Sequence, residues 1–278
     1  MTNEHADVNI SEHVQPLAGD IGPATWQRPA AEPVRHHAPS FDGQSLLQSM
    51  FSVIIIALFV ITFLVQAFVI PSESMEKTLL IGDYLLVNKV PFNTAGPWGK
   101  VMPYRDIQRG DIIVFHYPID PREHFVKRVI GIPGDHIRLR TKKVYVNGKL
   151  QDEPFAIHLP GNYEPYRDNF PAPNEYSGQV DRHWRADMMS HVEDGDIVVP
   201  KDRYFVLGDN RDVSIDSRYW GFVPRQNVVG RPLVIYLSVD GQGSSESEPG
   251  KGRAAQSVHT LAHIWQLARW NRMFRLIP

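Results

Sequence analysis

One uncharged stretch limits what the rest of this chain can be. Residues 43–72 carry no charged side chain, and Val53 to Val65 is an almost unbroken run of apolar residues. A helix that crosses a bilayer needs about 20 apolar residues, and residues 46–70 supply them. A buried core helix fits less well because such helices keep a polar face. A cleaved leader fits less well because the long polar segment before the stretch lacks a leader's basic start. We therefore predict one retained membrane anchor over residues 46–70.

The charges around this segment leave its orientation open. Arg28 and Arg35 precede it, and Lys77 and Lys89 follow it. The excess of positive charge that marks the cytoplasmic side of a membrane helix is therefore missing. The side that the large domain faces does not follow from these charges.

Composition excludes several function classes. The 278 residues include 29 basic and 31 acidic side chains, so no global field indicates a nucleic-acid partner. No cysteine is present, which excludes disulfides, thiolate metal sites and a cysteine nucleophile. The histidines before the anchor are too scattered for a metal site and lie at His5, His13, His36 and His37. We predict neither a metal nor a cofactor, and the sequence does not indicate an oligomeric state.

Short runs of β-branched and aromatic residues recur after the anchor. They are bounded by Gly-Asp, Pro-Gly-Asp or Asn-Gly turn signals and cover residues 83–89, 111–117, 125–131, 136–140, 143–147 and 204–207. Regularly spaced runs of this length predict a mainly β protein with an antiparallel-sheet body. The Asn147-Gly148 pair is typical of a hairpin turn.

These patterns divide the chain into parts. They are a disordered polar tail (1–42), a transmembrane anchor (46–70), a first β-domain (71–135 and 204–240), an inserted, loop-rich second β subdomain (136–203), and a linker with a C-terminal amphipathic segment (241–278). In the last part, Trp and Arg interleave over residues 254–277. This segment lies on a membrane interface as a helix, or it returns as a helix or strand to pack on the body.

A pair of serines follows the anchor directly, in Pro71-Ser-Glu-Ser-Met75. A serine in a loop is most often a cap or turn residue. Amide hydrolysis, however, needs a nucleophile, a base and donors for the developing oxyanion. Ser74, held close to the membrane, is a candidate for the nucleophile.

Lys127 and Arg128 stand next to each other in an apolar strand pattern. Because neighbouring side chains of a strand point to opposite faces, one of the two cations must point where apolar side chains point. The ordinary explanation is an edge strand whose charge reaches water. The alternative is a desolvated lysine whose pKa falls from about 10.4 toward neutrality. Such an amine can act as the base for a serine hydroxyl.

A polar block, Gly208-Asp-Asn-Arg-Asp-Val-Ser-Ile-Asp-Ser-Arg-Tyr-Trp-Gly221, completes the pattern. Most of its members fit a capped, ion-paired turn, in which Asp216 and Arg218 can pair. Ser214 can orient the amine of Lys127, as the third member of a catalytic triad orients its base.

Together these blocks resemble, in their order, the sequence boxes of bacterial type I signal peptidase. The matching segments are Pro71–Met75, Gly82–Lys89, Arg109–Asp111, Lys127–Asp135 and Gly208–Gly221, and the resemblance runs from about Phe68 to Val223. It implies a membrane-bound serine endopeptidase with a Ser/Lys dyad, which cleaves signal peptides from exported preproteins after small residues of the Ala-x-Ala type. It also implies a single-pass protein of the bacterial cytoplasmic membrane, with its N-terminus inside and its catalytic domain on the outer, periplasmic face.

The resemblance implies roles for individual residues as well. Ser74 matches the nucleophile and Lys127 the general base. Ser72 matches the side-chain donor of the oxyanion hole, which acts beside the backbone N–H of Ser74. The remaining matches are the lysine-orienting Ser214, the supporting ion pair of Asp216 and Arg218, and the substrate-pocket residues Phe68, Ile70, Leu85, Phe125 and Val126. The implied partners are preprotein signal peptides and the lipid bilayer.

Two positions depart from the family pattern. Glu73 stands between the serines, where glycine is common, and it can tune the lysine or contact the substrate. Lys77 stands where proline is usual, and we expect a looser turn there.

Two other functions fit parts of the pattern. A self-cleaving repressor also uses a Ser/Lys dyad, but it lacks an anchor and carries a DNA-binding head. A membrane-anchored β-domain that serves only as a binding module would make Ser74 and Lys127 incidental. Loss of preprotein cleavage in alanine variants of these two residues separates the peptidase from the binding module.

Overall fold

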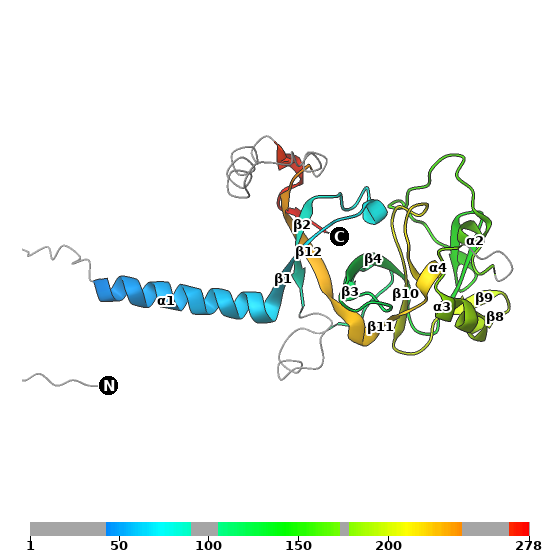
Figure 1. Ribbon diagram of the computed structural model, residues 1–278, viewed down its shortest axis with the longest axis horizontal. Helices are drawn as coiled ribbons and strands as arrows, with labels where there is room; N and C mark the ends of the chain where they lie inside the picture. Colours follow the sequence, from blue (N-terminus) through cyan, green and yellow to red (C-terminus); the bar gives the residue numbers. More distant parts are fainter. Residues whose placement is uncertain (1–42, 90–104, 173–177, 241–266, 278) are drawn as a thin grey trace, which may run out of the picture. The chain divides into compact units, whose positions relative to one another are not determined.

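A computed structural model describes residues 43–89, 105–172, 178–240 and 267–277 (Figure 1). The predicted polar tail and most of the predicted linker lie outside the described residues. The fold is built from two antiparallel sheets, which are preceded in the chain by one long helix.

The long helix covers most of the uncharged stretch. It consists of α1 (Gly43–Phe59) and a π-helical continuation, η1 (Val60–Leu64). Residues 43–64 form the one helix in the described part of the chain that is long and apolar enough to cross a membrane. The predicted anchor extended to Ile70, and this boundary is wrong: Val65–Val69 form strand β1, which pairs with β2. The antiparallel ladder satisfies the backbone there in place of helical hydrogen bonds.

The first sheet has eight strands, and every pairing in it is antiparallel. β13 (Arg275–Leu276) pairs with β12 beside the main path. The main path runs β1 (Val65–Val69), β2 (Asp83–Asn88), β12 (Val228–Ser238), β3 (Ile112–His116), β4 (His124–Gly131), β10 (Arg203–Leu207) and β11 (Val223–Pro224).

The second sheet lies within the predicted insertion of residues 136–203. It has five antiparallel strands in the order β7 (Lys149–Leu150), β6 (Lys143–Val146), β5 (His136–Arg140), β9 (Asp196–Val198) and β8 (Val192–Glu193). The Asn147-Gly148 turn joins β6 to β7 as expected, and both residues have the positive φ that this turn requires. Short helices complete the described part of the fold: α2 (Pro165–Asp168), α3 (Arg182–Asp187), α4 (Ser217–Trp220), η2 (Glu73–Met75), η3 (Met188–His191), η4 (Arg225–Asn227) and η6 (Trp270–Arg272).

The expectation of a mainly β protein after one apolar helix is confirmed. The runs predicted as strands correspond to β2, β3, β4, β5, β6 and β10. The longest strand, β12, was not predicted because Gly230 and Pro232 interrupt its apolar pattern. The pairing register of β12 shifts next to each of these residues. Such a local irregularity allows a glycine or a proline to occur within a central strand.

Two apolar clusters hold the sheets. The larger one joins residues from both sheets, including Ile130 of β4 and Ile137 of β5. The smaller one collects Ile70, Met75, Leu79, Leu85, Val87, Ile112, Val114, Ile235 and Ile277. The turn that carries Ser74 therefore rests on the smaller cluster through its neighbour Met75.

The described C-terminal residues return to the body as a strand. β13 pairs with β12, and Arg272 donates hydrogen bonds to the buried carboxylate of Asp83 at 2.5 and 3.2 Å. A membrane-surface helix over these residues is therefore wrong, and the alternative of a segment that packs on the body holds. The earlier part of the predicted amphipathic segment lies outside the described residues.

Candidate active site

Ser74 lies in a rigid turn directly after β1. Pro71 and the extended Ser72 lead into the short helix η2, which contains Ser74. The backbone N–H of Asn210 donates to the Ser74 carbonyl at 3.1 Å. Only 8% of Ser74 is exposed, while the next residue, Met75, is 1% exposed in the core. The core packing of Met75 and the hydrogen bond from Asn210 thus hold the turn in place.

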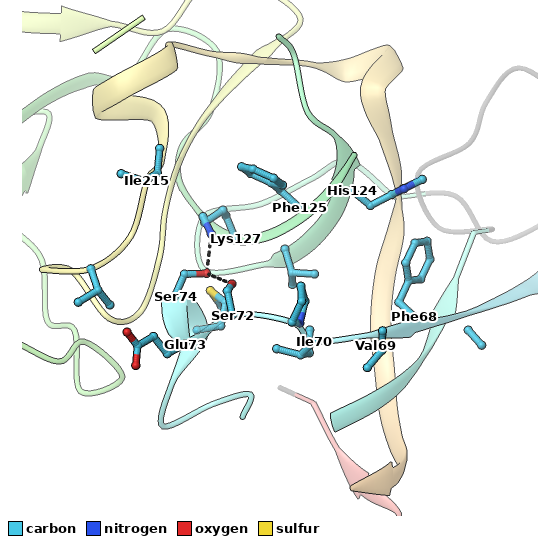
Figure 2. Close-up of a pocket in the computed structure, with 15 residues that line it drawn as sticks. Phe68, Val69, Ile70, Ser72, Glu73, Ser74, His124, Phe125, Lys127 and Ile215 are labelled. Carbon is cyan, nitrogen blue, oxygen red and sulfur yellow. Dashed lines mark hydrogen bonds between the residues drawn. The ribbon is translucent and has the colours of Figure 1, made fainter. Parts of the chain in front are cut away.

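Lys127 reaches this serine from β4. Its Nζ lies 2.6 Å from Ser74 Oγ, and the lysine is 4% exposed (Figure 2). Burial lowers the pKa of Lys127 from 10.5 to about 8, although the carboxylates of Asp216 and Asp209 act in the opposite direction. The Lys127 side chain therefore does not reach water as the edge-strand explanation requires. The desolvated amine is the alternative that the structure supports.

Arg128, the second cation of the Lys127-Arg128 pair, is neutralised by a carboxylate. It points to the other face of β4 and forms a buried ion pair with Asp209, with distances of 2.8 and 2.7 Å. Thr78 donates to the same carboxylate at 2.5 Å. The sequence did not indicate that Asp209 and Thr78 support this strand, because their contacts join segments far apart in the chain.

The polar block of residues 208–221, which follows β10, also borders the site. Asp216 and Arg218 form the predicted ion pair, with two hydrogen bonds of 2.8 Å, and both side chains are buried. Burial alone would raise the pKa of Asp216, but the charge and hydrogen bonds of Arg218 outweigh it and lower the pKa.

Ser214 lies in the same buried cluster. A Cβ added to Gly208 would come within 2.3 Å of Ser214 Oγ and 2.5 Å of the Ser74 carbonyl oxygen, so both residues pack against Gly208. The Ser214 hydroxyl helps to lower the pKa of Asp216, but it has no hydrogen-bond partner of ordinary geometry in the described residues. A bond from Ser214 to the Lys127 amine is therefore not part of this arrangement.

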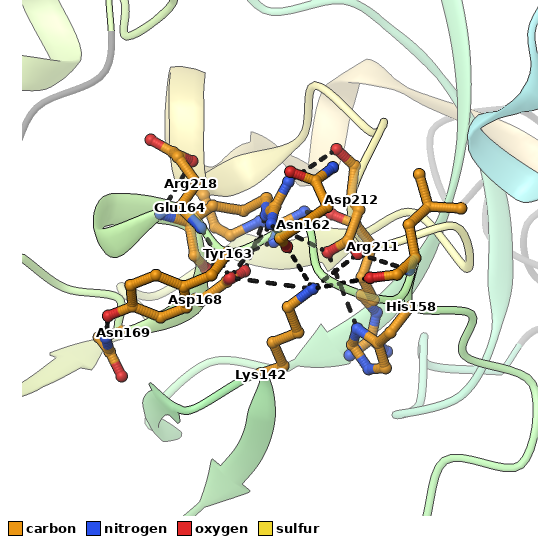
Figure 3. A network of polar contacts seen from close by, with 12 residues as sticks. Lys142, His158, Asn162, Tyr163, Glu164, Asp168, Asn169, Arg211, Asp212 and Arg218 are labelled. Carbon is orange, nitrogen blue, oxygen red and sulfur yellow. Dashed lines mark hydrogen bonds and ion pairs between the residues drawn. The ribbon is translucent and has the colours of Figure 1, made fainter.

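A polar network ties this block to the inserted subdomain (Figure 3). Asp212 accepts hydrogen bonds from Lys142 at 2.8 Å and from the backbone N–H of Leu159 at 2.6 Å. Arg167 donates to the Asp212 carbonyl and pairs with Asp168. The insertion thus fixes the end of the loop that carries Ser214.

Lys77 has a backbone conformation that proline cannot adopt. Its φ of 77° is unavailable to proline, whose φ stays near −65°. Its ammonium group donates to the carbonyl of Pro154 in the insertion. The departure from the family pattern thus adds a hydrogen bond between the serine turn and the insertion, and the looser turn stays a prediction.

An open groove of about 610 Å³ runs past Ser74 and Lys127. Four predicted pocket residues line it, namely Phe68, Ile70, Phe125 and Val126. Leu85 does not, because it is fully buried in the smaller cluster. His124, Val213 and Ile215 also line the groove, and the sequence missed the last two.

The family model for signal peptidase, peptidase S26, matches residues 44–237. The chain belongs to the signal peptidase family. Signal peptidase I of Pseudomonas aeruginosa is 39% identical over 206 residues, which cover 69% of this chain and 71% of that relative. Signal peptidase I of Aquifex aeolicus is 37% identical and covers 68% of this chain and 82% of its own length. Family membership and the apolar helix fit a membrane-anchored enzyme, and they disfavour both the binding module and the repressor.

Proposed function

We propose that this chain is a membrane-anchored serine endopeptidase that cleaves signal peptides from exported preproteins, with Ser74 as nucleophile and Lys127 as general base. The observation that carries the proposal is the 2.6 Å contact between a buried amine and a serine hydroxyl. Membership of the signal peptidase family supplies the reaction class.

The chemistry follows from the pKa of the amine. With a pKa of about 8, roughly a tenth of Lys127 is uncharged at pH 7 and about half at pH 8, and this uncharged fraction can take the hydroxyl proton of Ser74. The Ser74 oxygen then forms a bond to the carbonyl carbon of the scissile peptide. The resulting ammonium group gives its proton to the leaving amine when the C–N bond breaks. Lys127 next takes a proton from water, whose oxygen forms a bond to the acyl carbon. The bond between this carbon and Ser74 Oγ then breaks, Lys127 returns the proton to Ser74 Oγ, and the signal peptide is released.

Ser72 is placed to stabilise the oxyanion. Its hydroxyl lies 3.3 Å from Ser74 Oγ and lines the groove. The N–H of Ser74 lies in the first turn of η2, where N–H groups have no partner within the helix. These two donors can bind the negative oxygen of the tetrahedral intermediate.

The substrate binds in an extended conformation. The groove exposes the residues of β1 and the start of β4 on its two sides, which suits addition of a peptide strand. Phe68, Ile70 and Phe125 line the groove together with Ser74, and we expect their bulk to favour small side chains before the cut. This arrangement supports cleavage after Ala-x-Ala sequences.

We place the enzyme in the bacterial cytoplasmic membrane, with residues 1–42 inside and the two sheets on the outer face. The chain has no cysteine, so single cysteines report topology cleanly. In spheroplasts, a membrane-impermeant maleimide should label Lys149→Cys at the exposed end of β7 and leave Ser11→Cys unlabelled. The reverse pattern contradicts this orientation.

The direct test uses Ser74→Ala and Lys127→Ala in the full-length, membrane-reconstituted protein. Both variants should lose preprotein cleavage, while Lys143→Ala, an exposed lysine of β6, should retain it. Normal cleavage by either of the first two variants would refute the dyad.

A further inference from the structure

The groove has two arms that differ in chemistry (Figure 2). One arm is lined by β1 and the start of β4, with Phe68 and His124 at its end. The other arm lies beyond Ser74 and Lys127 and is lined by Glu73, Val213 and Ile215. Because Ser74 lies between them, a peptide that fills the first arm with residues before the cut must carry the residues after the cut into the second.

The wall of the second arm is built by an alternating segment. Asp212, Ser214 and Asp216 turn inward, where the first is fixed by Lys142 and the last by Arg218. The intervening Val213 and Ile215 are 37% and 36% exposed. Both apolar side chains are therefore held against the groove by buried polar neighbours, rather than left there by a loose loop.

Glu73 gives this arm a charge. It is exposed, and its carboxylate makes no ion pair or hydrogen bond to any residue that the structure describes. The other ionisable groups of the lining are His124, in the first arm, and Lys127. The second arm is thus an apolar wall beside one unpaired negative charge.

We propose that this second arm is a subsite for the first residues of the mature protein, and that Glu73 makes it select against acidic side chains and favour basic ones. This inference rests on the proposed function, because it assigns the direction of the same peptide through the same groove. Each extended residue advances about 3.3–3.6 Å, so the first two residues after the cut are those that pass Glu73.

The expected effect is modest and specific. Exposed charge pairs interact weakly, and a lysine and a glutamate differ by two charges. We expect the ratio of kcat/KM for a peptide with lysine two residues after the cut to that of its glutamate counterpart to be about three to ten in the wild type. The ratio should fall toward one as salt is raised.

The experiment compares this ratio between enzymes, so overall activity cancels. Glu73→Gln should bring the ratio to about one, and Glu73→Lys should invert it. Glu76→Gln is the matched control: it removes the same charge three residues further on, from a side chain that bonds Asn210 and does not line the groove. It should keep the wild-type ratio.

A second peptide pair carries the lysine or glutamate two residues before the cut, at the variable position of the Ala-x-Ala site. Its ratio should not depend on Glu73. If Glu73→Gln changes that ratio and leaves the first one unchanged, the peptide runs in the opposite direction and the inference is overturned. An equal rate for both mature-side peptides in the wild type also overturns it. Neither result affects the proposed function, which fails only if Ser74→Ala or Lys127→Ala still cleaves.

Discussion

Gly208 is the position where one added carbon should damage the active site most. Alanine at this position would place its Cβ 2.3 Å from Ser214 Oγ and 2.5 Å from the Ser74 carbonyl oxygen. Favourable contacts between heavy atoms lie at about 3.5–4.0 Å. The Ser74 turn and the Ser214 segment would therefore have to separate by about 1 Å.

That displacement sets the expected magnitude. Overpacking of a well-packed interior costs about 1–3 kcal/mol of the free energy of unfolding. A shift of about 1 Å in a reacting group can lower the rate about a hundredfold. Because the Asn210 bond and the core packing of Met75 hold the Ser74 turn, movement in either direction disturbs a supported group. We expect kcat to fall about a hundredfold in Gly208→Ala, with a smaller change in KM.

The assay measures kcat and KM on a peptide with an Ala-x-Ala site, together with the thermal midpoint. Gly178→Ala is the control, because nothing lies within 4 Å of the Cβ that it adds. It should match the wild type in both measurements. A Gly208→Ala enzyme that is folded and has wild-type kcat would show that the contact with Ser74 does not matter for catalysis.

Three further predictions concern the lysine and its surroundings. First, kcat/KM should rise with pH until Lys127 loses its proton, at about 8; a profile that is flat from pH 6 to 9 contradicts this. Second, Lys127→Met should abolish cleavage but raise the free energy of unfolding by about 3 kcal/mol at pH 7, measured by denaturant unfolding. Its depressed pKa makes the lysine costly below pH 8, and the cost disappears as pH rises to 10.5, so the advantage of the methionine should shrink over that range. Third, Ser72→Ala should lower kcat about a hundredfold with little change in KM, as loss of an oxyanion donor does; an unchanged kcat would remove Ser72 from the oxyanion hole.

Local patterns were sufficient to predict most strands. Runs of β-branched residues between turn signals predicted them because such residues fit a pleated, half-buried surface. β12 was missed because its decisive features are contacts. A Cβ on Gly230 would lie 2.1 Å from the Asn88 carbonyl oxygen on the neighbouring strand. Glycine is needed there for a close approach that no local pattern encodes.

The site was predictable to the extent that its chemistry is local. The serine turn and the Lys127-Arg128 pair stand out as sequence blocks. The error at Leu85 has a simple physical cause, since strand alternation defines two faces but not which one meets the groove. Val213 and Ile215 escaped notice because their exposure depends on the buried anchors beside them.

The C-terminal segment shows the same limit. Interleaved tryptophan and arginine fit a membrane-surface helix and a returning strand equally well. The choice depends on Arg272 and Asp83, which are 189 positions apart in the chain and joined by a buried ion pair. A contact of that sequence separation leaves no trace in local periodicity.

The most direct measurement is the titration of the Lys127 amine in the resting enzyme. Nitrogen NMR of lysine-labelled protein, with the signal assigned by its loss in Lys127→Met, reads the ionisation of this group without a substrate. We predict a midpoint at about 8. A midpoint above about 10, the value of a lysine in water, would mean that the amine is charged at working pH and cannot take the proton of Ser74.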